Sequence, residues 1–278
     1  SHTSYVNNVG GLEKVILEQY KVAHDRGYEY ISIFPICSNF AINGHVVKHH
    51  FQSYGVHVNN NDYVSMQYYE LVKFIANYKI EKVFIHSLIS YSFKQITNLL
   101  NTLPLISLFF YVHDYRSVCY GHNLLKNKKK YCGSDGLRLS KCMNCRFYIP
   151  SIFSARHYRS LFDRFSNMKF IFPSEAAKSV WCGTYKNIPK ERLIVLPHQI
   201  MSAERQEYSR NSRLRLAYIG YKSFNKGWET FRNLVRHINK KEIDIDLYVL
   251  GKTDEHLPNV QEIGVSFQKD GADAMVNA

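Results

Sequence analysis

Along most of the chain, short runs of consecutive apolar residues alternate with longer stretches in which apolar residues recur every three or four positions. The short runs predict strands buried on both faces, as in a parallel sheet, because a strand with one face in water alternates apolar with polar residues. The longer stretches predict amphipathic helices that cover such a sheet. The predicted strands are 28–36, 82–86, 105–112, 168–172 and 193–196, and the predicted helices are 11–27, 66–78, 93–100, 151–165 and 174–182.

The same alternation starts again near residue 214, after a polar segment that lacks apolar periodicity and that we predict to be a linker. We therefore expect an α/β protein with two Rossmann-like, doubly wound domains, 1–197 and 213–278, joined by the linker 198–212. About 65 residues are few for a doubly wound domain, so we expect the second domain to be incomplete. Its predicted elements are a strand over 214–219, a loop over 220–227, a helix over 228–238 and a strand over 245–250.

The composition of the chain indicates which class of partner it binds. The chain has 278 residues, of which 45% are hydrophobic and 21% are charged, as in ordinary globular proteins. The 36 Lys and Arg outnumber the 23 Asp and Glu, and the resulting formal charge of +13 favours nucleic acid, a phosphate-bearing small molecule or an acidic membrane surface as partner. No apolar run approaches the roughly 20 residues that span a bilayer, and no signal peptide opens the chain, so we expect a cytoplasmic protein.

Four of the six cysteines lie close together in the sequence and indicate a metal site; they are Cys119, Cys132, Cys142 and Cys145. The Cys142-x-x-Cys145 spacing is that of a zinc knuckle, and four thiolates suit a tetrahedral structural zinc ion without an open position. Residues 116–148 are predicted to form a long cysteine-rich loop without secondary structure, and such a loop needs a cross-link such as a bound metal ion to be ordered. An iron–sulfur cluster, two disulfides and free thiols stay open as alternatives.

Polar residues with suitable chemistry follow two neighbouring predicted strands. His86 ends one strand, and His113 and Asp114 follow the next. Ligands bind at the carboxyl ends of the strands in open α/β sheets, so we expect the two histidines to lie along one crevice. A histidine there can hydrogen-bond a sugar hydroxyl or a phosphate, and Asp114 can fix its tautomer or bind a hydroxyl. The competing interpretation is that each histidine is an ordinary surface or packed residue.

Two glycine-containing loops precede predicted helices. Gly10-Gly11 opens the first helix, where unobstructed backbone amides suit a phosphate or a sugar hydroxyl; a plain tight turn is the alternative. The loop 220–227 carries Lys222 and Lys226, and a lysine at such a helix start can neutralise a diphosphate. This loop lacks the Gly-Lys-Ser/Thr ending of a Walker loop and the Gly-x-Gly-x-x-Gly of a dinucleotide fold, so a solvated basic turn is its alternative.

The predicted helix 151–165 interleaves apolar residues with Arg156, His157, Arg159 and Arg164. A basic amphipathic helix of this kind can lie on anionic lipid. We favour the commoner arrangement, in which the apolar face packs on the sheet and the basic face is solvated.

Together these motifs resemble the retaining GT-B glycosyltransferases of family 4, and in particular the subset with a cysteine-rich loop after a His-Asp motif. Residues 7–14 resemble the amino-terminal Gly-Gly-x-Glu loop of that family, and His113-Asp114 with the four cysteines resembles the segment that marks the subset. Ser174-Glu175 is similar to the Ser-Glu that starts the last helices of the amino-terminal domain. Residues 218–228 resemble the Gly-x6-Gly donor loop, whose lysine contacts the nucleotide diphosphate.

The resemblance implies transfer of a sugar, with retention, from a nucleotide-sugar donor to a glycan or lipid-linked acceptor. It implies no catalytic metal, because protein cations offset the charge of the diphosphate, so zinc would be structural. It also implies no nucleic acid partner, and a lipid-linked acceptor would bring peripheral contact with the inner face of a membrane. The residues that it assigns are His113 and Asp114 for catalysis, Gly10, Gly11 and His86 for the acceptor, and Gly220, Lys222, Lys226 and Gly227 for the donor.

Three features depart from the family pattern. The strand that usually precedes Gly10 is missing, Tyr221 stands where the family commonly has Arg, and no Glu-x7-Glu pair occurs within 213–278. Those glutamates bind the donor in the family, so we expect the chain as given to be a truncated fragment without turnover. Other interpretations are a zinc-containing nucleic-acid-binding protein, a noncatalytic GT-B-fold binding or partner domain, and another two-domain nucleotide enzyme such as an epimerase. Salt-dependent oligonucleotide binding without nucleotide-sugar binding would favour the first of these.

Overall fold

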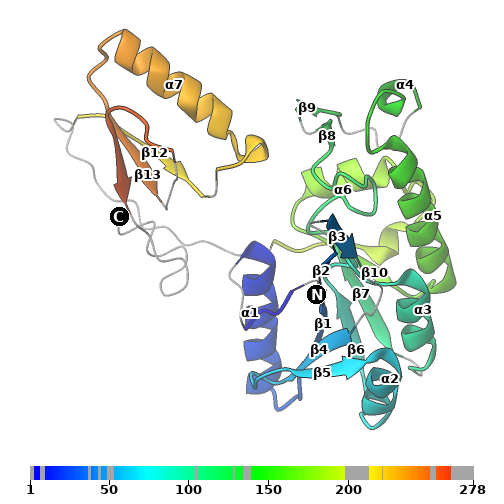
Figure 1. Ribbon diagram of the computed structural model, residues 1–278. Coiled ribbons are helices and arrows are strands. Elements are labelled where there is room, and N and C mark those ends of the chain that lie inside the picture. Colours follow the sequence, from blue (N-terminus) through cyan, green and yellow to red (C-terminus); the bar gives the residue numbers. More distant parts are fainter. Residues whose placement is uncertain are drawn as a thin grey trace. The chain divides into compact units, whose positions relative to one another are not determined.

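The computed structural model of the chain describes residues 3–6, 10–36, 39–42, 45–48, 53–103, 106–127, 129–133, 139–197, 213–220, 222–250 and 255–263. The chain divides into two compact units, Ser1–Gln199 (unit 1) and Ile200–Ala278 (unit 2). The predicted linker 198–212 lies outside the described residues. Both units combine helices with a parallel sheet (Figure 1).

Unit 1 contains a four-stranded sheet in the order β11-β10-β7-β6, and every pairing in it is parallel. Its strands are the apolar runs from which we predicted a parallel sheet. Successive side chains along a strand point to opposite faces, so apolar runs of this kind need cover on both sides. The strands are β6 (Lys82–Ile85), β7 (Ser107–Tyr111), β10 (Lys169–Phe172) and β11 (Leu193–Val195).

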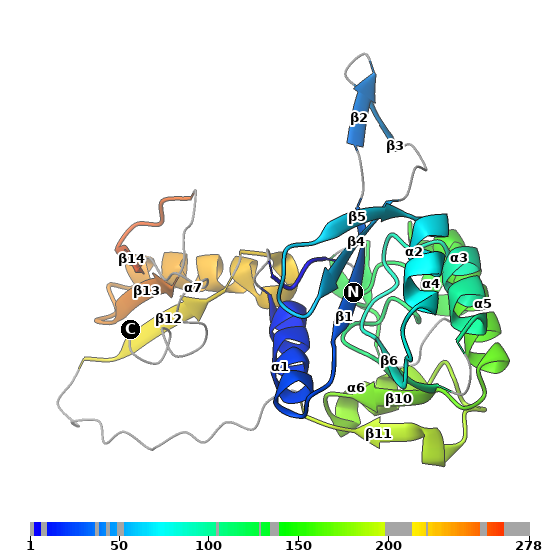
Figure 2. The same ribbon diagram turned by 90° about the horizontal axis from the view of Figure 1, so that it is seen from below.

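Helices supply that cover on both faces of the sheet. Figures 1 and 2 show α1 on one side and α3 and α5 on the other. Side-chain hydroxyls cap two helix starts: Ser92 Oγ accepts from Gln95 N at 3.4 Å, and Ser174 Oγ accepts from Ala177 N at 3.2 Å. The helices of unit 1 are α1 (Gly11–Asp25), α2 (Tyr68–Ala76), α3 (Phe93–Asn101), α4 (Leu139–Cys142), α5 (Tyr148–Arg164) and α6 (Glu175–Cys182), followed by the short 3₁₀ helix η1 (Lys190–Arg192).

Aromatic side chains fill the space between the sheet and α5. The ring of Phe170 in β10 lies 4.8 Å, centroid to centroid, from both Phe162 of α5 and Trp181 of α6, and all three residues are buried. Trp181 Nε1 donates to Ser117 Oγ at 3.0 Å, and Tyr185 Oη donates to the carbonyl of Ser117 at 2.5 Å. The turn that follows β7 is therefore anchored in the core.

A second sheet of unit 1 is antiparallel, in the order β1-β4-β5. The expectation that the run 28–36 belongs to a parallel sheet is wrong, because Ile31 pairs with Val58 and Ile36 with Ser53 in antiparallel register. An apolar run indicates that a strand is buried, but it does not specify which strand lies beside it or in which direction that strand runs. Met66, at the start of the predicted helix 66–78, instead pairs with Tyr54 in the sheet. The strands are β1 (Ile31–Ile36), β4 (Ser53–Val58) and β5 (Val64–Gln67).

Two short antiparallel hairpins also occur in unit 1. One of them, with α4, lies inside residues 116–148, so the expectation of a loop without secondary structure is wrong. Asn127 makes the hairpin possible, since it adopts a left-handed conformation (φ 51°) that asparagine tolerates better than most residues. The strands are β2 (Asn39–Ile42) and β3 (His45–Lys48) in the first hairpin, and β8 (Leu125–Lys126) and β9 (Lys130–Tyr131) in the second.

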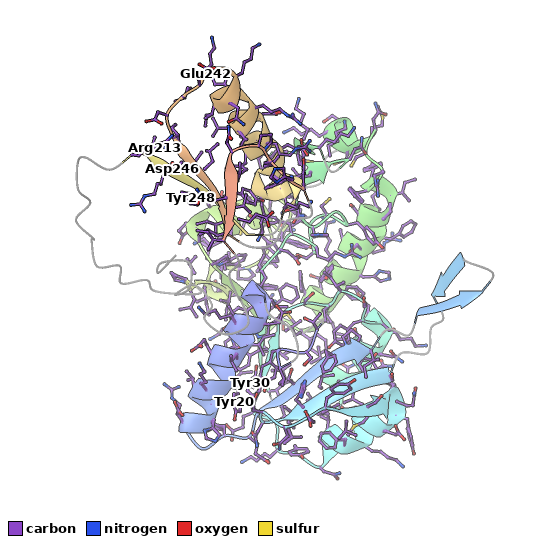
Figure 3. The ribbon with its side chains drawn as sticks, turned by 60° about the vertical axis from the view of Figure 1, so that its left-hand side comes forward. Tyr20, Tyr30, Arg213, Glu242, Asp246 and Tyr248 are labelled. Atoms are coloured by element: carbon purple, nitrogen blue, oxygen red, sulfur yellow. The ribbon has the colours of Figure 1, made fainter. Side chains whose placement is uncertain are left out.

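Unit 2 has a three-stranded parallel sheet in the order β12-β13-β14, with α7 packed on it. Trp228, Phe231 and Val235 of α7 are buried against Leu247 and Val249 of the sheet. Figure 3 shows Arg213 beside Asp246, and their ion pair measures 3.2 Å from Nη1 to Oδ1. The elements are β12 (Arg215–Ile219), the 3₁₀ helix η2 (Phe224–Lys226), α7 (Trp228–Lys240), β13 (Asp246–Leu250) and β14 (Val260–Ile263).

In both parallel sheets the strands follow one another in sequence order. A doubly wound sheet reverses that order at a switch point, and no reversal occurs among the strands that the structure describes. The structure thus shows a mixed α/β protein with parallel sheets, whereas double winding is not seen in its described part. No helix in that part is long and apolar enough to cross a bilayer.

Candidate functional site

The two strand-end histidines of unit 1 contact each other. His86 follows β6, His113 follows β7, and the two strands are parallel neighbours. His86 Nδ1 lies 2.8 Å from His113 Nε2, so one ring donates a hydrogen bond to the other. His86 is buried and His113 is partly exposed, which leaves His113 as the member that a ligand can reach. The expectation that the two histidines share one edge of the sheet agrees with this geometry.

Gln19 of α1 sets the direction of that hydrogen bond. His86 Nε2 lies 2.8 Å from Gln19 Oε1, and Tyr30 Oη also donates to this oxygen at 3.4 Å. A carbonyl oxygen only accepts, so His86 must carry its proton on Nε2 and has a lone pair on Nδ1 when neutral. His113 then donates from Nε2, and its own Nδ1 is the unprotonated nitrogen. In the neutral pair, the lone pair of the His113 ring is therefore on Nδ1.

Tyr111, the last residue of β7, supports both imidazoles. Its ring stacks on His86 with centroids 4.6 Å apart and on His113 with centroids 5.4 Å apart. Burial raises the pKa of Tyr111, while a side-chain hydrogen bond with Gln19 opposes the rise. Gln19 therefore contacts Tyr111 as well as His86. Burial also raises the pKa of Tyr30, so both phenols near Gln19 stay neutral at physiological pH.

Other tyrosines pack around α1. Figure 3 shows Tyr20 of α1 beside Tyr30, with ring centroids 6.0 Å apart. Tyr5 lies 6.2 Å from Tyr20 and 6.3 Å from Tyr30, and burial followed by the charge of Tyr20 raises the pKa of Tyr5 to about 12. These packed rings hold α1 against the strands, and so hold Gln19 at His86.

Asp114 caps the turn after His113. Its Oδ1 accepts from Arg116 N at 2.7 Å, a local turn that Asp forms readily. Ser117, at the end of the same turn, holds the buried Trp181 and Tyr185. The carboxylate therefore shapes the backbone beside His113, whereas the tautomer of His113 follows from His86 and Gln19.

Gly10 and Gly11 do begin α1, but the helix start already faces a carboxylate. A Cβ on Gly10 would collide with the side chain of Glu13, which is buried and accepts a hydrogen bond from Thr3. Close packing is thus one reason for glycine at position 10, although the end of the Glu13 side chain could move to admit a Cβ. Gly11 has open space where a Cβ would lie. Neither glycine contacts His86 or His113 through a bond that the structure records, and residues 7–9 lie outside the described part.

The predicted donor loop of unit 2 brings glycine and lysine together. Gly220 (φ 109°) and Gly227 (φ 81°) both have the left-handed backbone that favours glycine. The space beside Gly220 is bounded by Lys226, whose Cδ and Nζ would each lie 3.7 Å from a Cβ there. Lys226 is exposed, while the ammonium of Lys222 lies 6.0 Å from the centre of the Trp228 ring. Lys226 is accordingly the lysine of this loop that is placed to meet an anion.

The four clustered cysteines are near one another but are not arranged as a metal site. All four are unpaired and partly exposed. Burial is the main cause that raises the pKa of both Cys119 and Cys132, and the charges of Cys142 and Cys145 add to it. Within the described residues, no three His, Cys, Asp or Glu side chains form a group that could hold a metal ion.

Sequence reasoning did not identify Gln19 or Tyr111 as site residues. Gln19 stands among apolar residues at helical spacing on α1, and a polar residue in an apolar stripe is the signal that could have found it. His57 was equally missed, but it is a packed residue: both ring nitrogens are satisfied, by Ser4 Oγ at 2.8 Å and by the carbonyl of Asn61 at 2.7 Å.

Comparison with known proteins adds no assignment to this geometry. No protein-family model matches the chain, and no curated protein matches it in sequence.

Proposed function

We propose that the chain belongs to a retaining GT-B glycosyltransferase, which moves a sugar from a nucleotide-sugar donor to a glycan or lipid-linked acceptor in the cytoplasm. The hydrogen-bonded His86–His113 pair carries the proposal, because it lies at the carboxyl ends of two adjacent parallel strands. Open α/β sheets bind their ligands at this edge. The pair is on unit 1, which would receive the acceptor.

The transfer breaks the bond between the anomeric carbon and the diphosphate oxygen, and forms a bond from that carbon to an acceptor hydroxyl oxygen. The leaving diphosphate gains one negative charge on the oxygen freed from the sugar, and it takes up the proton that the hydroxyl releases. In this proposal the unprotonated Nδ1 of His113 accepts a hydrogen bond from a sugar hydroxyl and orients it, and Asp114 shapes the turn beside it. Lys226 of unit 2 offsets the charge on the diphosphate, with Lys222 nearby on the same loop.

Donor binding tests the role of unit 2. Nucleoside diphosphates and their sugars should raise the melting temperature of the chain, because a ligand that binds the folded state stabilises it by mass action. Lys226→Ala should abolish that rise, whereas Lys241→Ala, which removes the same charge from an exposed position after α7, should keep it. Equal responses of the two variants would contradict the assignment of Lys226.

Turnover tests the role of unit 1. In the intact protein, His113→Ala should lower release of nucleoside diphosphate from the accepted nucleotide sugar by about a hundredfold or more. The donor-induced rise in melting temperature should stay, because His113 and Lys226 belong to different units. His24→Ala, at an exposed histidine of α1, is the matched control. Full turnover in His113→Ala would refute the proposed site.

We also propose that Cys119, Cys132, Cys142 and Cys145 bind a structural zinc ion. The Cys142-x-x-Cys145 spacing and the mutual influence of the four thiols support this, although binding would have to draw them together. Elemental analysis of protein purified without chelator should find one zinc per chain, and Cys142→Ser should lose it. Cys182→Ser, outside the cluster, should keep it. Metal-free protein with two disulfides at these positions would refute the proposal.

A further inference from the structure

The excess positive charge of the chain is concentrated in one segment. Residues 115–162 contain ten Lys and Arg and a single Asp, which amounts to +9 of the formal +13. The segment covers β8, β9, α4 and most of α5. A nucleotide diphosphate needs only one or two cations, and Lys226 lies in the other unit. The proposed sugar-transfer site therefore does not explain this charge.

Large apolar side chains are exposed in the same segment. The exposed fractions are 65% for Met143, 65% for Ile149, 46% for Ile152 and 58% for Phe153. The last three stand three and four positions apart at the start of α5, so they share one face of the helix. Arg156, also exposed, continues that face. The expectation that the apolar residues of this helix pack on the sheet and its basic face is solvated therefore holds for only part of the apolar residues.

The inner face of α5 is already filled by other residues. Ala155, Tyr158, Leu161 and Phe162 are buried, and Tyr158 and Phe162 pack on Phe110 of the parallel sheet. Ile149, Ile152 and Phe153 therefore have no place in the core of unit 1. Exposed aliphatic and aromatic side chains gathered in this way mark an interaction surface.

Hydrogen bonds tie the basic hairpin to this apolar face. Lys126 Nζ donates to the carbonyl of Lys141 at 3.1 Å, Asn127 Nδ2 donates to the carbonyl of Asn144 at 3.2 Å, and Arg146 N donates to Asn127 Oδ1 at 2.9 Å. Figure 1 shows β8, β9 and α4 together near the amino-terminal end of α5. Basic and apolar groups therefore belong to one continuous part of unit 1.

We propose that this basic–apolar surface, formed by Lys141, Met143, Arg146, Ile149, Ile152 and Phe153, binds the anionic lipid surface of a membrane. Helix α5 would lie along the headgroups, with its exposed apolar residues inserted between the lipids and its basic residues at the phosphates. Anionic headgroups match a segment that has ten basic residues and one acidic residue. Nucleic acid would match the charge as well, but Phe153 is the single aromatic ring among the six residues of this surface, and Met143, Ile149 and Ile152 offer no ring on which successive bases could stack.

This surface does not depend on the sugar-transfer reaction. A transferase with a lipid-linked acceptor would gain from it, because binding confines the enzyme to the leaflet that holds the acceptor. The experiment below measures lipid binding alone, so a failed transferase proposal leaves its outcome intact.

Vesicle sedimentation of the full 278-residue chain tests the surface. The chain should sediment with vesicles of phosphatidylcholine mixed with phosphatidylglycerol, and much less with phosphatidylcholine alone. The double variant Ile149→Ser/Phe153→Ser should weaken binding about tenfold or more, because each side chain loses apolar burial. The double variant Arg146→Ala/Arg156→Ala should weaken it by about fivefold per residue. Binding should also fall as salt is added.

Matched controls are available on the same unit. Tyr69, on α2, has an exposed fraction of 67%, so Tyr69→Ser removes an aromatic ring as accessible as that of Phe153. Lys79→Ala/Lys186→Ala removes two exposed basic residues outside the surface. Both controls should sediment like the unmodified chain, and circular dichroism should show that every variant is folded.

Three results would overturn the proposal. The first is equal binding to anionic and neutral vesicles. The second is unchanged vesicle binding in Ile149→Ser/Phe153→Ser. The third is tighter binding to a single-stranded oligonucleotide than to vesicles at the same salt concentration, if that binding is weakened by Arg146→Ala/Arg156→Ala and not by Ile149→Ser/Phe153→Ser. This result would assign the surface to nucleic acid.

Discussion

Replacing Gln19 by glutamate keeps the oxygen that His86 Nε2 contacts at 2.8 Å and adds one negative charge at that point. An opposite charge within about 4–6 Å favours the charged form of a titrating group by roughly one to three pH units. Gln19 is only partly buried, so we expect the lower half of that range. In Gln19→Glu the His86–His113 pair should therefore take up its proton at a pH about one to two units higher than in the unmodified chain.

The sign of the stability change follows from the same charge. The variant favours the protonated pair in the folded state only while the introduced carboxylate is ionised. Its added stability is therefore largest between about pH 4 and pH 6.5, the ordinary pKa values of a Glu and a His side chain, and it is lost both as pH rises past the new titration and as the carboxylate takes up its proton. Raising the titration midpoint by one pH unit corresponds to about 1.4 kcal/mol, so the gain within this range is about 1–3 kcal/mol. Gln19→Leu should act in the opposite direction, because it leaves His86 Nε2, in a buried ring, without its acceptor and costs about 1–3 kcal/mol.

Nuclear magnetic resonance of histidine labelled with nitrogen-15 measures both the tautomers and the titration. The variants His86→Gln and His113→Gln identify the two signals among the 13 histidines of the chain. Val22→Glu places the same charge on an exposed position of α1, 49% accessible, and serves as the control. A titration in Gln19→Glu that matches Val22→Glu, or a neutral His113 with its proton on Nδ1, would refute the tautomer that we derive.

The remaining predictions concern packing. Ser117→Ala leaves Trp181 Nε1 buried without its acceptor and should lower the free energy of unfolding by about 1–3 kcal/mol in urea titrations; an unchanged midpoint would show that the turn is not anchored there. Gly55→Ala should cost about 1–3 kcal/mol, because its Cβ would collide with the ring of Phe34, and Phe34→Leu in the same chain should recover part of that loss. Gly227→Ala should destabilise unit 2 by about 1–2 kcal/mol, because position 227 has φ 81°; Gly11→Ala, at a site with ordinary helical backbone and open space, should leave its own unit as stable as before.

Sequence patterns located the parallel strands of unit 1 within two residues, whereas β14 of unit 2 was not predicted. β6, β7, β10 and β11 are apolar runs, and burial on both faces is a property of each segment by itself. The same reasoning failed for β1, because its apolar run is just as continuous but pairs antiparallel with β4. The direction of pairing depends on which strand is adjacent in space, and the sequence of one segment alone does not specify its neighbour.

The candidate site, too, could be predicted from the sequence only in part. Placement at strand ends was enough to select His86 and His113, since the carboxyl edge of a parallel sheet follows from the strand pattern. Gln19 is 67 residues away from His86 in the chain, and only the packing of α1 on the sheet brings its oxygen to the imidazole.

For α5, the sequence by itself determined that a helix with apolar and basic residues would form. The tertiary structure decided which apolar residues are used for the core and which remain outside, because a helix can bury only the face that meets the sheet. Periodicity is a local property, whereas the choice of face, of strand partner and of hydrogen-bond acceptor is made by contacts between segments that are distant in the chain.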